Sequence, residues 1–140
     1  MRLIRLATIL ATMAAAGCGS SSLPGDDALI AKFRANEKEF RSVVGSMSGQ
    51  GGRMLKAETR DRIDALGVKL AAIDGKADPP RVVFRAASTG WAMEGTSKGF
   101  LYSTEAPAPI LPSLDDAHLG RRSSAFRAIT QDWYLYLRHD

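Results

Sequence analysis

The chain has 140 residues, of which 45% are hydrophobic and 24% are charged, and its formal net charge is +4. This length suits one domain, and the composition is that of a globular protein, which excludes a disordered or mainly membrane-embedded chain. The charge is too small and too scattered to indicate a nucleic-acid-binding surface, where Lys and Arg gather on one face. A single Cys excludes an intramolecular disulfide.

Residues 1–17 have the layout of a secretory signal peptide. Arg2 and Arg5 precede an uncharged apolar run over residues 6–16, which ends in small side chains. This run is shorter than the roughly 20 apolar residues that a membrane-spanning helix needs. We therefore expect a cleaved signal rather than a permanent transmembrane segment.

The junction from Ala15 to Cys18 resembles a bacterial lipobox, although Ala15 stands where Leu is usual. The resemblance implies cleavage after Gly17 and a lipid on the sulfur of Cys18. Two or more acyl chains anchor a protein stably, so we expect attachment to a membrane through Cys18. Gly19 follows, where an Asp would resemble an inner-membrane retention signal, so the expected location is the outer membrane, facing the periplasm.

Residues 18–25 are expected to form the lipidated Cys and a flexible tether, and residues 26–140 a single folded domain. Asp26 and Asp27 suit the start of a helix, because carboxylates accept its free N–H groups. Apolar residues then recur at helical spacing among charged ones. This pattern predicts an amphipathic helix over residues 27–44.

Residues 45–52 contain four Gly and are expected to form a loop. They lack the residues that phosphate-binding and dinucleotide-binding loops require. A second helix is predicted over residues 57–66, with Gly67 suited to the left-handed conformation that ends helices. Residues 68–73 fit either a short strand or another helical turn, and Pro79 ends whatever precedes it.

After the prolines the hydrophobic period changes to two, which predicts strands. Residues 81–88 and 98–103 are expected to form single strands, and residues 126–138 a hairpin that turns at residues 130–132. The fold class is therefore α+β. We expect the N-terminal amphipathic helices to pack on one face of a C-terminal antiparallel sheet of about four strands.

Aromatic residues gather in the sheet half, and a sheet covered on one face buries only about half of them. In the last strand Trp133 should face the core, with Tyr134 and Tyr136 on the opposite face. Residues 104–114 hold three prolines and are expected to form an extended surface loop. Core packing accounts for most of the aromatic residues, and the three prolines also fit a plain connection between strands. The aromatic residues outside the core, together with the prolines, would suit a partner surface. Its candidate residues are Trp91, Tyr102, Tyr134, Tyr136, Pro107, Pro109 and Pro112.

Catalytic and metal-binding residue types are scattered along the chain. His118 lies in an expected loop and His139 beside the end of the chain, which does not favour a Ser-His-Asp arrangement. Asp115 and Asp116 with His118 come nearest to a metal cluster, but Asp in a turn explains them as well. We expect no metal and no cofactor.

Two further pairs contain residue types that can act as catalytic groups. Glu94 and Glu105 would have to face each other across a cleft to act as paired carboxylates, yet glutamates beside short strands are common on surfaces. Ser97 and Lys98 are adjacent in a strand and should point to opposite faces. No catalytic residue is therefore predicted, and an enzyme is not expected.

Four stretches of the sheet half, over residues 82–91, 95–103, 113–115 and 132–136, resemble a group of small proteobacterial lipoproteins of uncharacterised function. The most specific of them are a Ser-Lys-Gly-aromatic motif and a C-terminal Trp-Tyr strand. The resemblance also takes in the N-terminal helix at Phe33, Asn36 and Phe40. It implies a lipoprotein with a compact α+β fold and carries over no catalytic or binding residue.

Taken together, these features predict a membrane-anchored envelope lipoprotein that acts as a non-enzymatic binding or structural module. Its expected partner, besides the membrane held by Cys18, is an envelope protein or glycan. The alternative is a periplasmic inhibitor of a hydrolase, since small anchored domains with one protruding loop suit that task.

Overall fold

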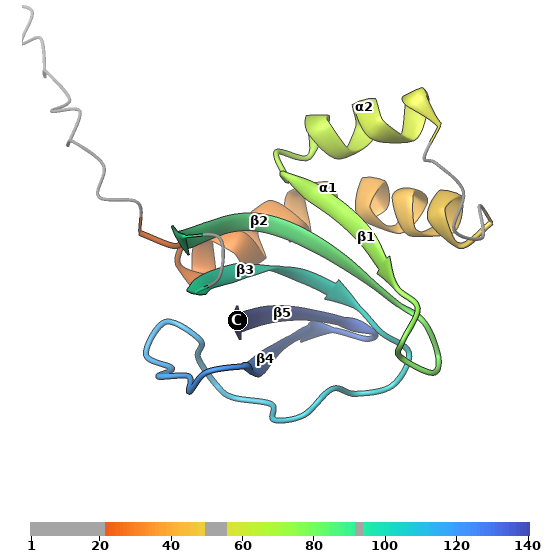
Figure 1. The fold of residues 1–140 in the computed structure, drawn as a ribbon. Coiled ribbons are helices and arrows are strands. Elements are labelled where there is room, and N and C mark those ends of the chain that lie inside the picture. Colours follow the sequence, from red (N-terminus) through yellow and green to blue (C-terminus); the bar gives the residue numbers. More distant parts are fainter. Residues whose placement is uncertain (1–21, 50–55, 92–93) are drawn as a thin grey trace, which may run out of the picture.

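The computed structural model describes residues 22–49, 56–91 and 94–140, so the expected signal peptide and Cys18 lie outside the described residues. Within these residues two helices precede five strands (Figure 1). The helices and strands are α1 (Asp26–Ser48), α2 (Ala57–Ala65), β1 (Leu70–Asp74), β2 (Arg81–Trp91), β3 (Glu94–Tyr102), β4 (Ser123–Thr130) and β5 (Trp133–His139). The strands form one antiparallel sheet in the order β1-β2-β3-β5-β4, which confirms the predicted α+β class.

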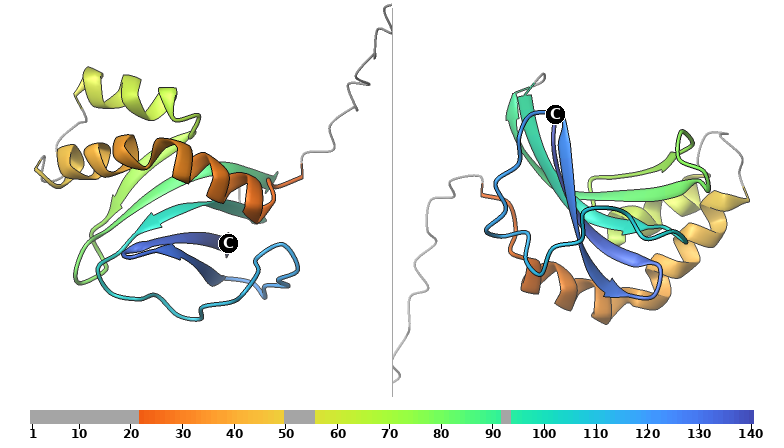
Figure 2. Two further views of the ribbon diagram at one scale, coloured as in Figure 1. Left: turned by 180° about the vertical axis from the view of Figure 1, so that it is seen from behind. Right: turned by 90° about the horizontal axis from the view of Figure 1, so that it is seen from below.

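Both helices belong to one layer on the sheet. Seen from behind in Figure 2, α1 crosses the sheet, and α2 lies beside it. We call the opposite face of the sheet, which carries Leu70, Arg85 and Tyr136, the outer face. In the part of the chain that the structure describes, no helix covers the outer face (Figure 1). Neither of these helices is long and apolar enough to cross a membrane.

The core is a cluster of aromatic rings between α1 and the sheet. Phe33 and Phe40 of α1 bring their ring centroids to 4.9 and 5.8 Å from that of Trp133, which is fully buried. The ring of Phe40 also lies 4.8 Å from Phe100 and 5.3 Å from Phe84. Such aromatic pairs contribute beyond the area that they bury, so they fix α1 on the sheet.

Helix α1 is kinked at Asn36, whose backbone leaves the helical conformation. The side-chain amide of Asn36 donates a hydrogen bond to the carbonyl oxygen of Lys32 at 2.9 Å. This hydrogen bond gives the Lys32 carbonyl a partner next to the break in the backbone hydrogen bonds of the helix. Because Phe33 and Phe40 lie on either side of the kink and both reach Trp133, the bend fits α1 to the sheet.

The predicted loop over residues 45–52 is wrong for its first four residues, because α1 continues to Ser48. Met47 is buried in the core, so the amphipathic pattern extends past the first Gly. The hydroxyls of Ser46 and Ser48 donate to carbonyl oxygens one turn earlier in the helix. Burial of one more apolar residue thus outweighs the low helix propensity of this segment.

The second helix was predicted correctly to within one residue, and Gly67 has the expected left-handed φ of 67°. Residues 68–73, which fitted either strand or helix, contain most of β1. Strand β1 pairs with β2 from Leu70 opposite Arg85 to Asp74 opposite Arg81. The sheet therefore has five strands among the described residues instead of about four.

The segment between β3 and β4 has no helix or strand of its own, as predicted, but it is not wholly a surface loop. The carbonyl of Pro109 accepts a hydrogen bond from the amide of Phe126 at 3.0 Å, and the amide of Leu111 donates back to Phe126 at 2.7 Å. Pro107 is buried, which corrects its expected exposure. The segment packs along β4 and covers that edge of the sheet.

Candidate functional site

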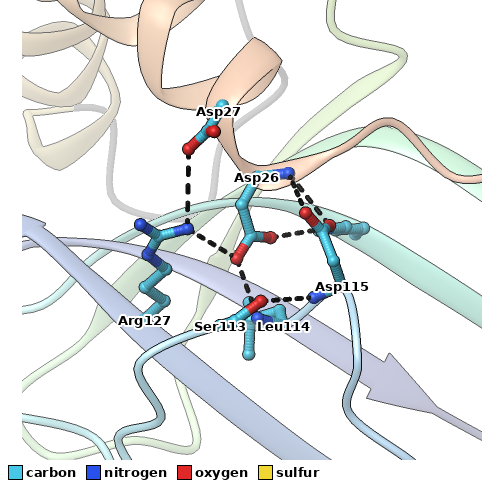
Figure 3. Close-up of polar contacts among 7 residues, drawn as sticks. Asp26, Asp27, Ser113, Leu114, Asp115 and Arg127 are labelled. Carbon is cyan, nitrogen blue, oxygen red and sulfur yellow. Dashed lines mark hydrogen bonds and ion pairs between the residues drawn. The ribbon is translucent and has the colours of Figure 1, made fainter.

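A charge cluster of Asp26, Lys98, Asp115 and Arg127 joins α1, β3, β4 and the segment before β4 (Figure 3). The ammonium nitrogen of Lys98 lies 2.6 Å from Oδ1 of Asp26 and 2.7 Å from Oδ1 of Asp115. The guanidinium of Arg127 lies 2.9 Å from Oδ2 of Asp26, which also accepts the amide of Leu114 at 2.8 Å. Both Asp26 and Lys98 are buried. Two negative and two positive groups thus balance one another where these segments meet, with Asp26 and Lys98 on the buried side.

Asp115 caps α1 from a distant part of the chain. Its two carboxylate oxygens accept the amide of Asp26 at 3.0 and 3.1 Å (Figure 3). Asp26 was expected to cap the helix itself, but Gly25 is the residue at the N-cap and makes no side-chain cap. The carboxylate of Asp26 turns inward because Lys98 and Arg127 attract it, and Asp115 supplies the missing acceptor.

The electrostatics keep Asp26 ionised. Burial opposes the charged carboxylate, but hydrogen bonds from Leu114, Lys98 and Arg127 outweigh it and hold the pKa of Asp26 below its usual value. The ammonium of Lys98 is enclosed by two carboxylates, so its hydrogens are directed to them. The cluster fastens distant segments to one another, and each of its charged groups lies beside a group of opposite charge.

A hollow of about 600 Å³ opens on the outer face of the sheet. Apolar side chains of β1 and β2, two hydroxyls, three cations and two carboxylates surround it. Its lining comprises Leu70, Ala72, Ile73, Asp74, Gly75, Lys76, Val83, Arg85, Ser97, Tyr136, Arg138 and Asp140. The Nε atom of Arg85 is buried and has no hydrogen-bond partner among the described residues. Such an atom calls for an explanation, because buried donors are nearly always satisfied.

Tyr136 was expected on the face opposite Trp133, which is confirmed, and in an exposed partner surface, which is wrong. It does point to the outer face, yet it is only 5% exposed. Its strand β5 has β3 and β4 on either side, so neighbouring side chains flank the ring. Burial raises the pKa of Tyr136, although a hydrogen bond with the Ser97 hydroxyl and the charges of Arg85 and Arg138 oppose the rise. The phenol is therefore neutral at physiological pH.

The structure does not bring the predicted partner surface together. Tyr102 is half-buried on the helix-covered face, with its ring centroid 5.3 Å from that of Trp133, whereas Tyr134 is half-buried on the outer face. Pro109 and Pro112 are exposed along the β4 side of the sheet. Trp91 ends β2, and its side chain lies outside what the structure describes.

Among the described residues, neither histidine lies in a Ser-His-Asp arrangement. His118 is exposed, and Nδ1 of His139 lies 2.9 Å from the hydroxyl of Thr96. Within residues 22–49, 56–91 and 94–140, no group of three His, Cys, Asp or Glu side chains is placed to hold a metal ion. Asp115, the neighbour of Asp116 in the sequence, instead forms an ion pair with Lys98 in the charge cluster.

The candidate acidic and nucleophilic pairs are also separated. Glu94 begins β3 and forms an ion pair with Arg121, whereas Glu105 follows the other end of the strand. Ser97 lines the hollow on the outer face and Lys98 is buried on the other, which confirms that they point apart.

Sequence reasoning missed the charge cluster and the hollow. The period of two places Lys98 on the same face as Phe100, which is a signal for a buried charge needing partners. The sequence pattern does not indicate which carboxylates are the partners of Lys98.

In comparisons with family models, curated proteins and solved structures, nothing matches this chain.

Proposed function

We propose that this protein is an envelope lipoprotein, anchored through Cys18, whose folded domain is a non-enzymatic binding module. The outer face of the sheet around the hollow is its contact surface. The proposed location is the outer membrane, with the domain in the periplasm, where an envelope protein or glycan is the partner.

The observation that carries this proposal is the hollow on the sheet face that the helices leave uncovered, whose lining includes Arg85 without a carboxylate partner among the described residues. The core side of the sheet is filled by aromatic rings, and its charged groups are balanced within the charge cluster. Binding sites combine apolar lining with a few placed polar groups, and the hollow has both. The outer face thus offers groups that a partner can satisfy.

Site-specific photocrosslinking in living cells tests which surface makes the contact. A photoreactive amino acid at Leu70, on the rim of the hollow, is compared with one at Ile110, beside β4. The two positions are matched, because each side chain is 45% exposed. We expect a discrete adduct from position 70 and none from position 110. An adduct from position 110 alone would move the contact to the proline-containing segment and refute the proposal.

The anchor is tested separately with the Cys18→Ser variant. We expect it to take up no labelled palmitate and to leave the membrane fraction or remain unprocessed. Equal palmitate labelling of the variant and the unchanged chain would end the lipoprotein assignment, while leaving the contact surface to be judged by photocrosslinking.

A further inference from the structure

The hollow is built around a row of residues that crosses the sheet. Leu70, Arg85, Gly99 and Tyr136 are paired in register on β1, β2, β3 and β5. They therefore share the outer face, as directly paired residues do. Gly99 places no side chain between Arg85 and Tyr136, because the backbone of β2 fills the space that a side chain would take.

The backbone requires Gly at the centre of this row. The register between β2 and β3 shifts next to Arg85, where a β-bulge brings the two strands close together. A Cβ atom on Gly99 would lie 1.9 Å from the carbonyl oxygen of Phe84, an overlap that backbone atoms cannot relieve cheaply. Any other residue at position 99 would push β2 away and displace Arg85.

The charges around the hollow leave Arg85 available. Among the described residues, no carboxylate pairs with Arg85, and its buried Nε lacks a hydrogen-bond partner. Asp74 and Asp140 line the hollow as well; the carboxylate of Asp74 accepts the backbone amide of Lys76, and the charge of Asp140 acts on Tyr136, whose pKa it helps to raise. The guanidinium group of Arg85 therefore has no opposite charge beside it within the described fold, so a ligand of negative charge can supply one.

The other lining groups define the rest of the ligand. The Tyr136 phenol stays neutral because burial raises its pKa, so it remains a hydrogen-bond donor. Leu70, Ala72 and Val83 form an apolar side of the hollow. Guanidinium groups bind carboxylate and phosphate through two parallel hydrogen bonds.

We infer that the hollow binds a ligand with an oxyanion, carboxylate or phosphate, on an apolar body, with Arg85 holding the oxyanion and Leu70 contacting the body. This inference rests on the proposed function, because it names the chemistry that the outer face recognises. The volume of about 600 Å³ lies within the range of roughly 300–1,000 Å³ for small-ligand sites.

The test uses three probes with the same apolar body: 3-phenylpropanoate, 2-phenylethyl phosphate and the neutral 3-phenylpropanol. The lipidated full chain in phosphatidylcholine nanodiscs is titrated by calorimetry, and the Arg85 Nε–H resonance is followed by NMR. We expect at least one anion to bind at least tenfold more tightly than the alcohol and to shift that resonance. The anion that binds more tightly shows whether the natural ligand carries a carboxylate or a phosphate ester.

The matched variants are Arg85→Gln and Arg81→Gln, since Arg81 lies on the same strand and face but outside the hollow. Arg85→Gln should weaken anion binding at least tenfold, and Arg81→Gln should not change it. If Arg85→Gln does not fold, Leu70→Glu provides a second test. Its carboxylate lies opposite Arg85 and should compete with the ligand, so anion binding should weaken. The corresponding control is Ile110→Glu, which should bind as the unchanged chain does.

Equal binding of the alcohol and both anions, or unchanged binding after Arg85→Gln or Leu70→Glu, would overturn the inference. Absence of binding by either anion would also overturn it. In each case a photoadduct from position 70 would leave the proposed function standing, so the two failures are distinguishable.

Discussion

Replacement of Lys98 by Met tests whether the charge cluster holds the fold together. Lys98 is 2% exposed and contacts the carboxylates of Asp26 and Asp115 at 2.6 and 2.7 Å. Met has a similar volume, so the variant loses the ammonium without opening a large cavity. Asp26 would then remain buried, and among the described residues it would keep Arg127 and the Leu114 amide as stabilising partners.

The expected loss in the free energy of unfolding is about 3–5 kcal/mol, the usual cost of removing one partner of a buried ion pair. The lower end is favoured because Arg127 still compensates Asp26. Domains of this size are stabilised by about 5–15 kcal/mol in total, so the change is easily measured. Urea unfolding followed by circular dichroism at pH 7 gives the value, with Lys69→Met as an exposed control.

The pH dependence follows from the lowered pKa of Asp26. In the unchanged protein the ionised carboxylate contributes stability above its ordinary pKa of 3.8, and this is lost as the pH falls through the lower folded pKa. In Lys98→Met the contribution is smaller, so the difference between the two proteins should be largest near pH 7 and narrow near pH 3. A difference below about 1 kcal/mol at pH 7, or one that does not change with pH, would refute the reasoning.

Three further predictions concern packing, backbone and capping. Trp133→Ala should lower the free energy of unfolding by about 3–5 kcal/mol, whereas Tyr134→Ala, at a half-buried position, should cost much less; equal losses in melting temperature would contradict the face assignment. Gly99→Ala should destabilise the sheet because its Cβ would overlap the Phe84 carbonyl, and an unchanged melting temperature would show that the bulge relaxes. Asp115→Ala removes both the cap of α1 and one partner of Lys98, so hydrogen exchange at the Asp26 amide should accelerate; unchanged protection there would rule out the cap.

Local patterns in the sequence predicted most of the fold. The helical spacing around Phe33 and Phe40, the left-handed Gly67 and the alternation from Trp133 to Leu137 each depend on neighbours in the chain. These features carry their structural information within a few residues, so the α+β class and the hairpin at the C-terminal end followed from them.

The candidate sites were not predictable because they depend on contacts between distant segments. Asp26 and Leu114 are 88 positions apart, and Asp26 and Arg127 are 101 apart. Arg85 pairs with Gly99, and Gly99 pairs with Tyr136. The first of these pairings depends on the β-bulge between Arg85 and Ala87, which shifts the register of β2 against β3 by one residue. Alternation assigned Tyr136 to the correct face, but its burial depends on the strands on either side.

The yield of the photoadduct from position 70 in living cells tests the central claim most directly when it is compared between the unchanged chain, Arg85→Gln and Arg81→Gln. If the outer face around the hollow is the contact surface, the adduct forms with the unchanged chain and with Arg81→Gln and is strongly reduced with Arg85→Gln. Equal adduct yields from all three proteins, at equal protein levels, would contradict the assignment of Arg85 and its hollow as the binding site.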